Sequence, residues 1–121
     1  MRTYSNTPLN RIEPVGDGSY FYRWNIVENK VSEELAGMRW SADEVVVSPP
    51  ITANTILESV IGAMWPTNYE QKLINEYNAA ILGISDGEVA DRAREAYAKF
   101  LRDRAALKAH VEADCKELNI E

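Results

Sequence analysis

Residues that could bind a metal ion gather near the C-terminal end of the chain. His110 is the only histidine. Asp103, Asp114 and Glu117 stand at spacings that would share its face if this segment is helical. A closed zinc site needs four ligands, so other elements would have to supply the rest. Charged residues at such spacings are more often a solvated helix face, and we therefore predict no metal ion and no cofactor.

The residues needed for catalysis are not arranged in a known pattern. A Ser–His–Asp triad requires a nucleophile beside His110, and the chain contains no nucleophile-elbow sequence. Cys115, the only cysteine, points off the histidine's helical face, and we interpret it as a half-buried apolar residue. The adjacent acids at residues 33–34 and 43–44 lack the contrasting environments that acid–base pairs need. The sequence thus predicts a protein that is not an enzyme.

Gly16, Asp17 and Gly18 could form an anion-binding nest of backbone amides. Neither a P-loop nor a Rossmann glycine pattern surrounds them, and no helix is expected to follow. Glycine tolerates positive φ, which a tight hairpin turn requires. We therefore interpret these residues as a turn between two strands.

The composition limits the classes of partner. The chain has 121 residues, is 45% hydrophobic and carries a formal net charge of −6. This length suits one domain with a single core. The excess of acid disfavours nucleic acid and anionic membranes, which attract basic proteins. The N-terminus lacks the apolar run of a signal peptide, no stretch has the apolar length of a membrane span, and a single cysteine permits no intrachain disulfide.

The first half of the chain has the pattern of a β meander. Residues 1–10 are polar, and we predict that they form a flexible arm. Residues 11–48 are expected to form three antiparallel strands. The expected strands are residues 11–15, 19–28 and 38–47, with a loop at residues 29–37.

The third expected strand changes the phase of its apolar alternation midway. Because one extra residue turns every later side chain to the other face, we predict a β-bulge or a strand break near Asp43 and Glu44. Pro49 and Pro50 should end the sheet, since neither can donate a ladder hydrogen bond.

The second half predicts three helices, at residues 52–65, 67–82 and 86–118. Thr52 is the expected N-cap of the first helix, which Pro66 should stop. Residues 67–70 and residues 85–88 have capping-box spacing. Gly83 suits the residue after the second helix, where a left-handed conformation is common. The predicted fold class is therefore α+β, with residues 11–121 forming a single domain.

The last predicted helix is longer than a core of this size can cover. Residues 86–118 would extend roughly 50 Å. Val89, Ala93, Ala96, Tyr97 and Phe100 make a good inner stripe in its first half, whereas Leu107, Val111 and Leu118 are sparse in its second. The second half should project into solvent, pack against a second copy or a partner, or break; of these we favour self-association.

The aromatic residues allow two interpretations. Tyr20, Tyr22, Trp24, Trp40, Trp65, Tyr69 and Tyr77 suffice to form one core. Alternatively, Phe21, Trp40 or Trp65 could be exposed anchors for a protein partner. Stacking on single-stranded nucleic acid is disfavoured by the net charge.

Two stretches resemble phage proteins. Residues 16–25, GDGSYFYRWN, resemble the turn and strand near the start of some small tail-cluster proteins of tailed phages and prophages. The stretch from residues 43–47, DEVVV, through residues 70–80, EQKLINEYNAA, is similar to small uncharacterised proteins of prophage-type clusters in gut bacteria. The resemblance implies a structural or assembly accessory role. The missing signal peptide and membrane span predict a cytoplasmic protein, and the resemblance adds the virion as the alternative location.

Taken together, the residues favour a non-enzymatic protein-interaction or assembly protein. Its expected binding surface is the long C-terminal helix together with the aromatic strand surface. One alternative is a small-ligand-binding domain or enzyme, with a pocket between the aromatic strand face and the first helix. Another is a regulator that inhibits a host protein. The expected partner-binding residues are Phe21, Trp40, Trp65, Leu107, Val111 and Leu118.

Overall fold

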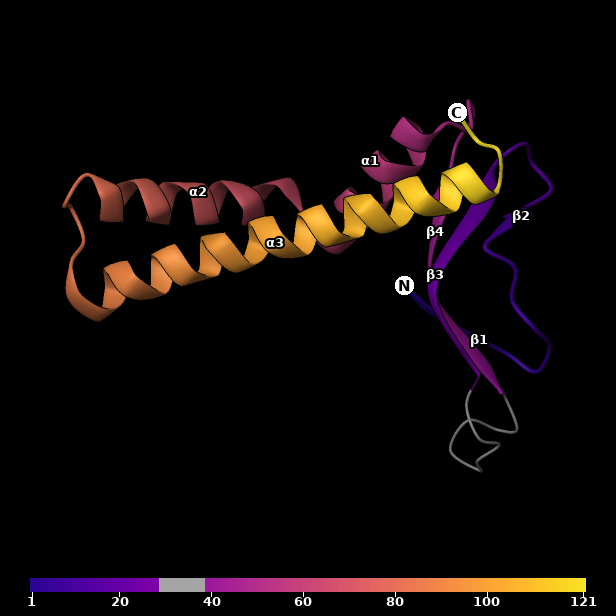
Figure 1. Cartoon of the computed structure of the whole chain (residues 1–121), viewed down its shortest axis with the longest axis horizontal. Coiled ribbons are helices and arrows are strands. Elements are labelled where there is room, and N and C mark those ends of the chain that lie inside the picture. Colours follow the sequence, from indigo (N-terminus) through magenta and orange to yellow (C-terminus); the bar gives the residue numbers. More distant parts are fainter. Residues whose placement is uncertain (29–38) are drawn as a thin grey trace. The chain divides into compact units, whose positions relative to one another are not determined.

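The computed structural model describes residues 1–28 and 39–121 (Figure 1). An antiparallel sheet comes first in the chain and three helices follow, so the predicted α+β class is confirmed. The chain divides into two compact units, Met1–Ala63 and Met64–Glu121. The prediction of a single domain at residues 11–121 concerns independent folding and stays a prediction. The loop expected at residues 29–37 and the acids at 33–34 lie outside the described residues.

The sheet of the first unit has four strands in the order β1-β4-β3-β2. The strands are β1 (Arg2–Ser5), β2 (Ile12–Pro14), β3 (Tyr20–Glu28) and β4 (Trp40–Val47), and every neighbouring pair is antiparallel. The last three lie where the sequence predicts strands. The hairpin turn between β2 and β3 is also confirmed, because the amide of Val15 donates to the carbonyl of Ser19 at 3.0 Å.

The flexible arm predicted at residues 1–10 is wrong for β1. Arg2 pairs with Asp43 and Ser5 with Trp40, so β1 forms an outer strand beside β4. Its side chains are polar or exposed and carry no apolar alternation. The strand therefore depends on backbone hydrogen bonds to a segment some forty residues away, which local sequence patterns do not reveal.

The β-bulge predicted near Asp43 lies in the neighbouring strand. Trp24 of β3 pairs with Asp43, and Val27 pairs with Ser41, so β3 carries one more residue than β4 between these pairs. Asn25 sits at this bulge with a φ of 51°. Asparagine tolerates this left-handed conformation better than most residues. The phase change in β4 thus indicated a real irregularity, but the extra residue belongs to its partner strand.

The buried apolar residues of the first unit lie in the sheet and in α1 (Ala53–Met64). Tyr22 and Trp24 are buried and stack with ring centroids 5.8 Å apart. The other buried apolar residues of the sheet and of α1 are Ala42, Val47, Ile56 and Val60. Tyr22 and Trp24 are two positions apart in β3, and Ile56 and Val60 are four positions apart in α1, so each pair lies on one face of its element.

Thr52 is the N-cap of α1, as predicted. Its hydroxyl accepts the amide of Thr55 at 3.1 Å, and the Thr55 hydroxyl accepts the amide of Thr52 at 2.9 Å. Two amides that lack partners within the helix are thereby satisfied. β4 ends at Val47, ahead of Pro49 and Pro50, which are joined by a cis peptide bond.

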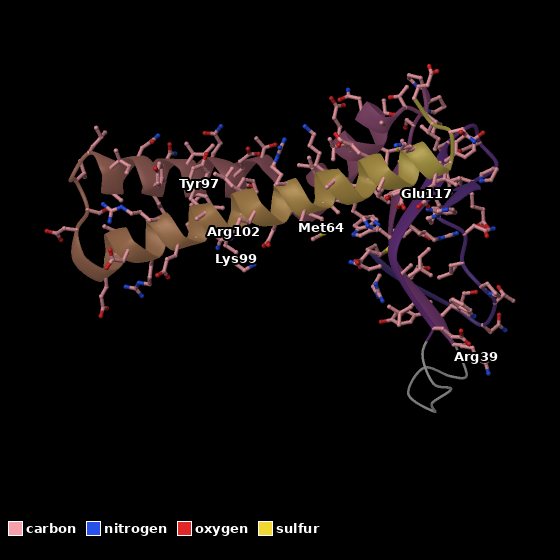
Figure 2. The ribbon with its side chains drawn as sticks, in the orientation of Figure 1. Arg39, Met64, Tyr97, Lys99, Arg102 and Glu117 are labelled. Atoms are coloured by element: carbon pink, nitrogen blue, oxygen red, sulfur yellow. The ribbon has the colours of Figure 1, made fainter. Side chains whose placement is uncertain are left out.

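The second unit is a helical hairpin of α2 (Thr67–Ile81) and α3 (Gly87–Glu117), packed side by side (Figure 1). Between the helices, Ala80 of α2 packs with Ala90 and Ala93 of α3. An aromatic cluster continues this contact. Trp65 and Tyr69 pack edge to face on Phe100, and the ring centroids of Tyr77 and Tyr97 are 4.9 Å apart. Figure 2 shows Tyr97 between the two helices and Lys99 on the side of α3 away from α2.

The hairpin turns at Gly83, which has a φ of 75°. The amide of Ile84 donates to Ala79 O at 2.9 Å, and the amide of Gly83 donates to Ala80 O at 3.3 Å. This Schellman pattern satisfies carbonyls that the helix end leaves open, and it confirms the role predicted for Gly83.

Both predicted capping boxes are wrong. Pro66 occupies the N-cap of α2 and Asp86 that of α3, and neither helix has a side-chain cap hydrogen bond. Instead, the carbonyl of Pro66 accepts the amides of Tyr69 and Glu70. Pro66 itself is extended, with a ψ of 148°, and the helical residues begin at Thr67.

α3 is one unbroken helix of 31 residues, within one residue of the predicted bounds. The alternative in which it breaks is therefore wrong. Val111, Asp114 and Cys115 are buried near the end of α3, as Ala93 and Phe100 are in its first half. The alternative in which the second half lies wholly in solvent is therefore wrong as well. Among the described residues, no helix is both long enough and apolar enough to span a bilayer.

Candidate interaction surface on the helical hairpin

The predicted partner residues of the strands lie at half-buried positions. Phe21 packs against its neighbour Arg23, whose guanidinium carbon is 5.0 Å from the ring centroid. Trp40 stands opposite Ser5 in β1 and Glu28 in β3. Neither side chain is fully exposed, and their proposed contact with a partner stays a prediction.

The predicted partner residues of the helices differ in exposure. Trp65 is half-buried against Phe100, with ring centroids 5.4 Å apart. Leu107 and Leu118 are half-buried, whereas Val111 is fully buried. The structure does not gather these four residues and the two of the strands into one exposed patch.

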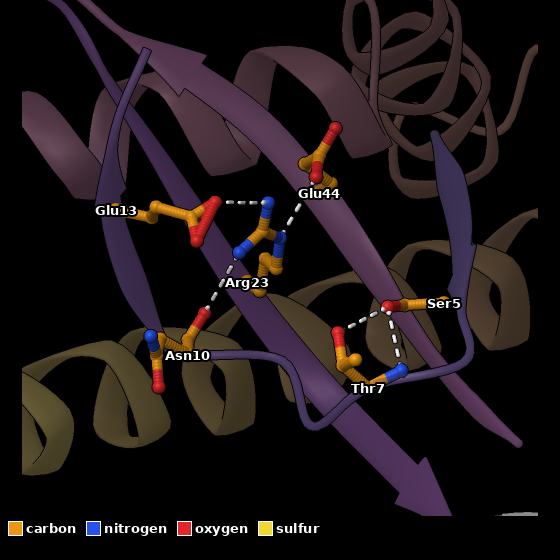
Figure 3. Close-up of polar contacts among 6 residues, drawn as sticks. All are labelled: Ser5, Thr7, Asn10, Glu13, Arg23 and Glu44. Atoms are coloured by element: carbon orange, nitrogen blue, oxygen red, sulfur yellow. Dashed lines mark hydrogen bonds and ion pairs between the residues drawn. The ribbon is translucent and has the colours of Figure 1, made fainter.

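A buried arginine organises one face of the sheet (Figure 3). Arg23 is only 5% exposed. Its guanidinium donates to Glu44 at 2.8 Å, to Glu13 at 3.2 Å and to the carbonyl of Asn10 at 3.2 Å. These contacts join β2, β3, β4 and the segment before β2. Because both carboxylates are engaged with the cation, we interpret this cluster as structural.

A second arginine secures the bulge. Arg2 donates to the hydroxyl of Ser41 at 2.9 Å and to the carbonyl of Asn25 at 3.2 Å, and it lies 3.4 Å from the carboxylate of Asp43. Asn25 in turn donates to Asp43 at 2.9 Å. Asp43 and Glu44, the adjacent acids considered above as an acid–base pair, therefore stabilise the pairing of the strands.

The histidine and the cysteine show no activated arrangement. His110 lies 3.2 Å from the carboxylate of Asp114 on the next helical turn. Cys115 is 2% exposed, and its burial, helped by Asp114 and Glu112, raises the pKa of the thiol. A protonated thiol is a poor nucleophile. Within residues 1–28 and 39–121, no three His, Cys, Asp or Glu side chains are grouped closely enough to hold a metal ion.

An open groove of about 350 Å³ lies along the helical hairpin. Its apolar lining is Ala79 from α2 and Val89, Ala93 and Ala96 from α3, and its polar lining is Glu76, Ser85 and Arg92. The α3 residues are three or four positions apart and so share one face. Alanine side chains are too short to fill the space between the helices. The groove is thus a direct result of small residues at this position.

The tip of the hairpin exposes aliphatic side chains. Ile81 is 56% exposed, Leu82 73% and Ile84 77%, and Val89 at the rim of the groove is 59% exposed. Loops on protein surfaces are usually polar. A cluster of exposed aliphatic residues beside an apolar groove is the pattern of a binding surface. We call the groove and this tip together the hairpin surface.

Carboxylates surround a second depression that adjoins the groove at Arg92. Glu88, Asp91 and Glu95 line this shallow depression together with Arg92. Asp91 lies 3.4 Å from Arg94. Within the described part of the chain, the carboxylates of Glu88 and Glu95 form no ion pair. The hydroxyl of Ser85, buried in the groove lining, likewise has no hydrogen-bond partner among the described residues.

Sequence reasoning missed the hairpin surface. It assigned Val89 and Ala96 to the inner stripe of the long helix, yet both are exposed, and Ala90 is buried in their place. The available signal was the apolar run at residues 79–84, which passes straight through a helix end. Helix ends in water are normally polar, so such a run indicates either burial or a binding surface.

Comparisons with protein-family models, with curated proteins and with solved structures found no match to this chain.

Proposed function

We propose that this protein is a non-enzymatic interaction protein, a structural or assembly accessory that binds a protein partner through the hairpin surface. The observation that carries the proposal is the group of exposed aliphatic side chains at the hairpin tip, next to an apolar groove. Fully burying one aliphatic side chain of this size stabilises a contact by about 1.5–3 kcal/mol. Covering the tip would therefore make a substantial contribution to binding.

The resemblance of residues 16–25 to phage tail-cluster proteins supports an assembly role in particular. In that setting the partner is another component of the same particle, and the protein acts in the cytoplasm or in the virion. The ligand-binding alternative has less support: Tyr22 and Trp24, which would line its pocket, are buried and stacked on each other.

The test compares partner capture by two doubly substituted proteins. Leu82→Asp with Ile84→Asp places two charges on the tip, at side chains that are 73% and 77% exposed, so folding should be preserved. The matched control is Val27→Asp with Val46→Asp, which makes the same change at exposed residues of the sheet. Circular dichroism checks that both proteins fold.

Crosslinking in lysate of the source organism, followed by mass spectrometry, identifies the captured protein. We expect the tip variant to lose a partner that the wild type and the control retain. Retention of every partner by the tip variant would refute the proposal, and so would a loss in the control alone.

A further inference from the structure

The shape of the groove restricts what can occupy it. The groove runs between two helices whose backbone amides and carbonyls are used internally, so an extended strand would find no backbone to pair with. A helix needs only a surface for its apolar stripe. The short side chains of Ala79, Ala93 and Ala96 let a third helix approach closely, which would complete a three-helix bundle.

The charges beside the groove restrict the occupant further. Glu88 and Glu95 are seven residues apart, which places them two helical turns and about 10.5 Å apart along α3. Arg92 lines the same depression, but neither carboxylate forms an ion pair among the described residues, whereas Glu76 at the other wall lies 3.9 Å from Lys72. An occupant that brings two cations with the same spacing would neutralise both carboxylates at once.

We propose that the hairpin groove binds an amphipathic helix of a partner protein, with an apolar stripe flanked by two Lys or Arg residues seven positions apart. The stripe lies on the alanines of the groove, and the two cations face Glu88 and Glu95. A polar side chain near one end of the stripe reaches the hydroxyl of Ser85, which lacks a partner among the described residues. This inference rests on the proposed function and names the partner's chemistry.

A second copy of this chain is a poorer occupant. Each copy has a net charge of −6, so two copies repel one another as they approach. A basic helix is instead attracted to the same surface, and its association should weaken as salt is added.

The test uses designed peptides of about 18 residues, long enough to form a helix on binding. The first has a leucine stripe flanked by two lysines seven residues apart, and the second has glutamates in place of the lysines. A scrambled peptide keeps the composition of the first but has no apolar stripe. Fluorescence anisotropy of the labelled peptides measures their Kd at low salt.

The wild-type protein should bind the lysine peptide and neither the glutamate nor the scrambled peptide. The double substitution Glu88→Lys with Glu95→Lys should raise the Kd of the lysine peptide by roughly tenfold or more. The same variant should bind the glutamate peptide, which the wild type does not. The control, Glu112→Lys with Glu121→Lys, makes the same charge change at exposed residues outside the groove and should change the Kd by less than about threefold.

A further pair of variants tests the groove itself. Ala96→Phe fills it and should abolish binding of the lysine peptide, whereas Ala106→Phe, at an exposed position of α3 outside the groove lining, should not. Equal binding of the scrambled peptide, an unchanged Kd for Ala96→Phe, or no exchange of preference on charge reversal would each overturn the inference. The proposed function would stand in these cases if the tip variant still loses its captured partner, so the two failures are distinguishable.

Discussion

Replacing Arg23 with methionine would remove the only cation that the described contacts place between Glu13 and Glu44. The Glu44 side chain is 12% exposed, so its carboxylate would be left nearly buried and unpaired. Removing one partner of a buried ion pair costs about 3–5 kcal/mol. The Glu13 side chain is 44% exposed, so losing its ion pair with Arg23 should add less than about 1 kcal/mol to the loss of stability. Because water still reaches Glu44, we expect a total loss of about 3 kcal/mol.

The loss should depend on the charge that is left behind. Arg23→Met combined with Glu44→Leu removes both partners, and buried ion pairs replaced by apolar residues often cost little. We therefore expect the double variant to be more stable than the single Arg23→Met variant by about 1–2 kcal/mol. Arg39→Met is the control, because Arg39 pairs with Glu28 at 3.8 Å with both side chains more than half exposed. That substitution should cost less than about 0.5 kcal/mol.

Urea unfolding at neutral pH, followed by far-UV circular dichroism, measures these free energies. Two-state analysis applies if tryptophan fluorescence gives the same transition. If Arg23→Met loses no more than Arg39→Met, the cluster does not stabilise the sheet. If the double variant is less stable than the single one, the unpaired carboxylate is not the cause of the loss.

Three further outcomes follow from the described contacts. Gly83→Ala should destabilise the protein by about 1–2 kcal/mol in urea unfolding, because Gly83 has a φ of 75°; an unchanged midpoint would show that the turn relaxes. The hydroxyl and the amide of Ser19 donate to Asp17 and hold the pKa of that carboxyl below its usual value. These hydrogen bonds stabilise the fold at pH values above the unfolded-state pKa of Asp17, and this stability is lost as pH falls through the lower folded-state pKa. NMR titration of Asp17 should show the lowered pKa, and Ser19→Ala should raise it. Cys115, with its raised pKa and 2% exposure, should react with a thiol reagent only slowly until urea unfolds the chain, and fast reaction of the native protein would contradict its burial.

Much of the local structure could be predicted because its causes lie within a few residues. The cap of Thr52 on Thr55 spans four residues, and the Schellman turn at Gly83 spans six. The continuity of α3 likewise follows from a long segment without proline and without glycine after Gly87. For these elements the hydrogen bonds are nearly local, so residue types and spacing sufficed.

Other features were decided by contacts between distant segments. β1 exists because β4 offers a free edge, and Arg2 reaches Asp43 only in the folded sheet. The bulge is in β3 and not in β4 because a phase change reports a mismatch between two strands without saying which one carries the extra residue.

The hairpin surface shows the same division between local and distant causes. Residue types alone predict that α3 is a long amphipathic helix and that an apolar run crosses the end of α2. The tertiary structure decided that Ala90 faces α2 while Val89 and Ala96 remain exposed. A difference of one position rotates a helical side chain by about 100°, so a pattern that fits two neighbouring faces cannot select between them. The packing of α2 against α3 selects the buried face. The groove lies where Ala79 of α2 and Ala93 and Ala96 of α3 leave space between the helices.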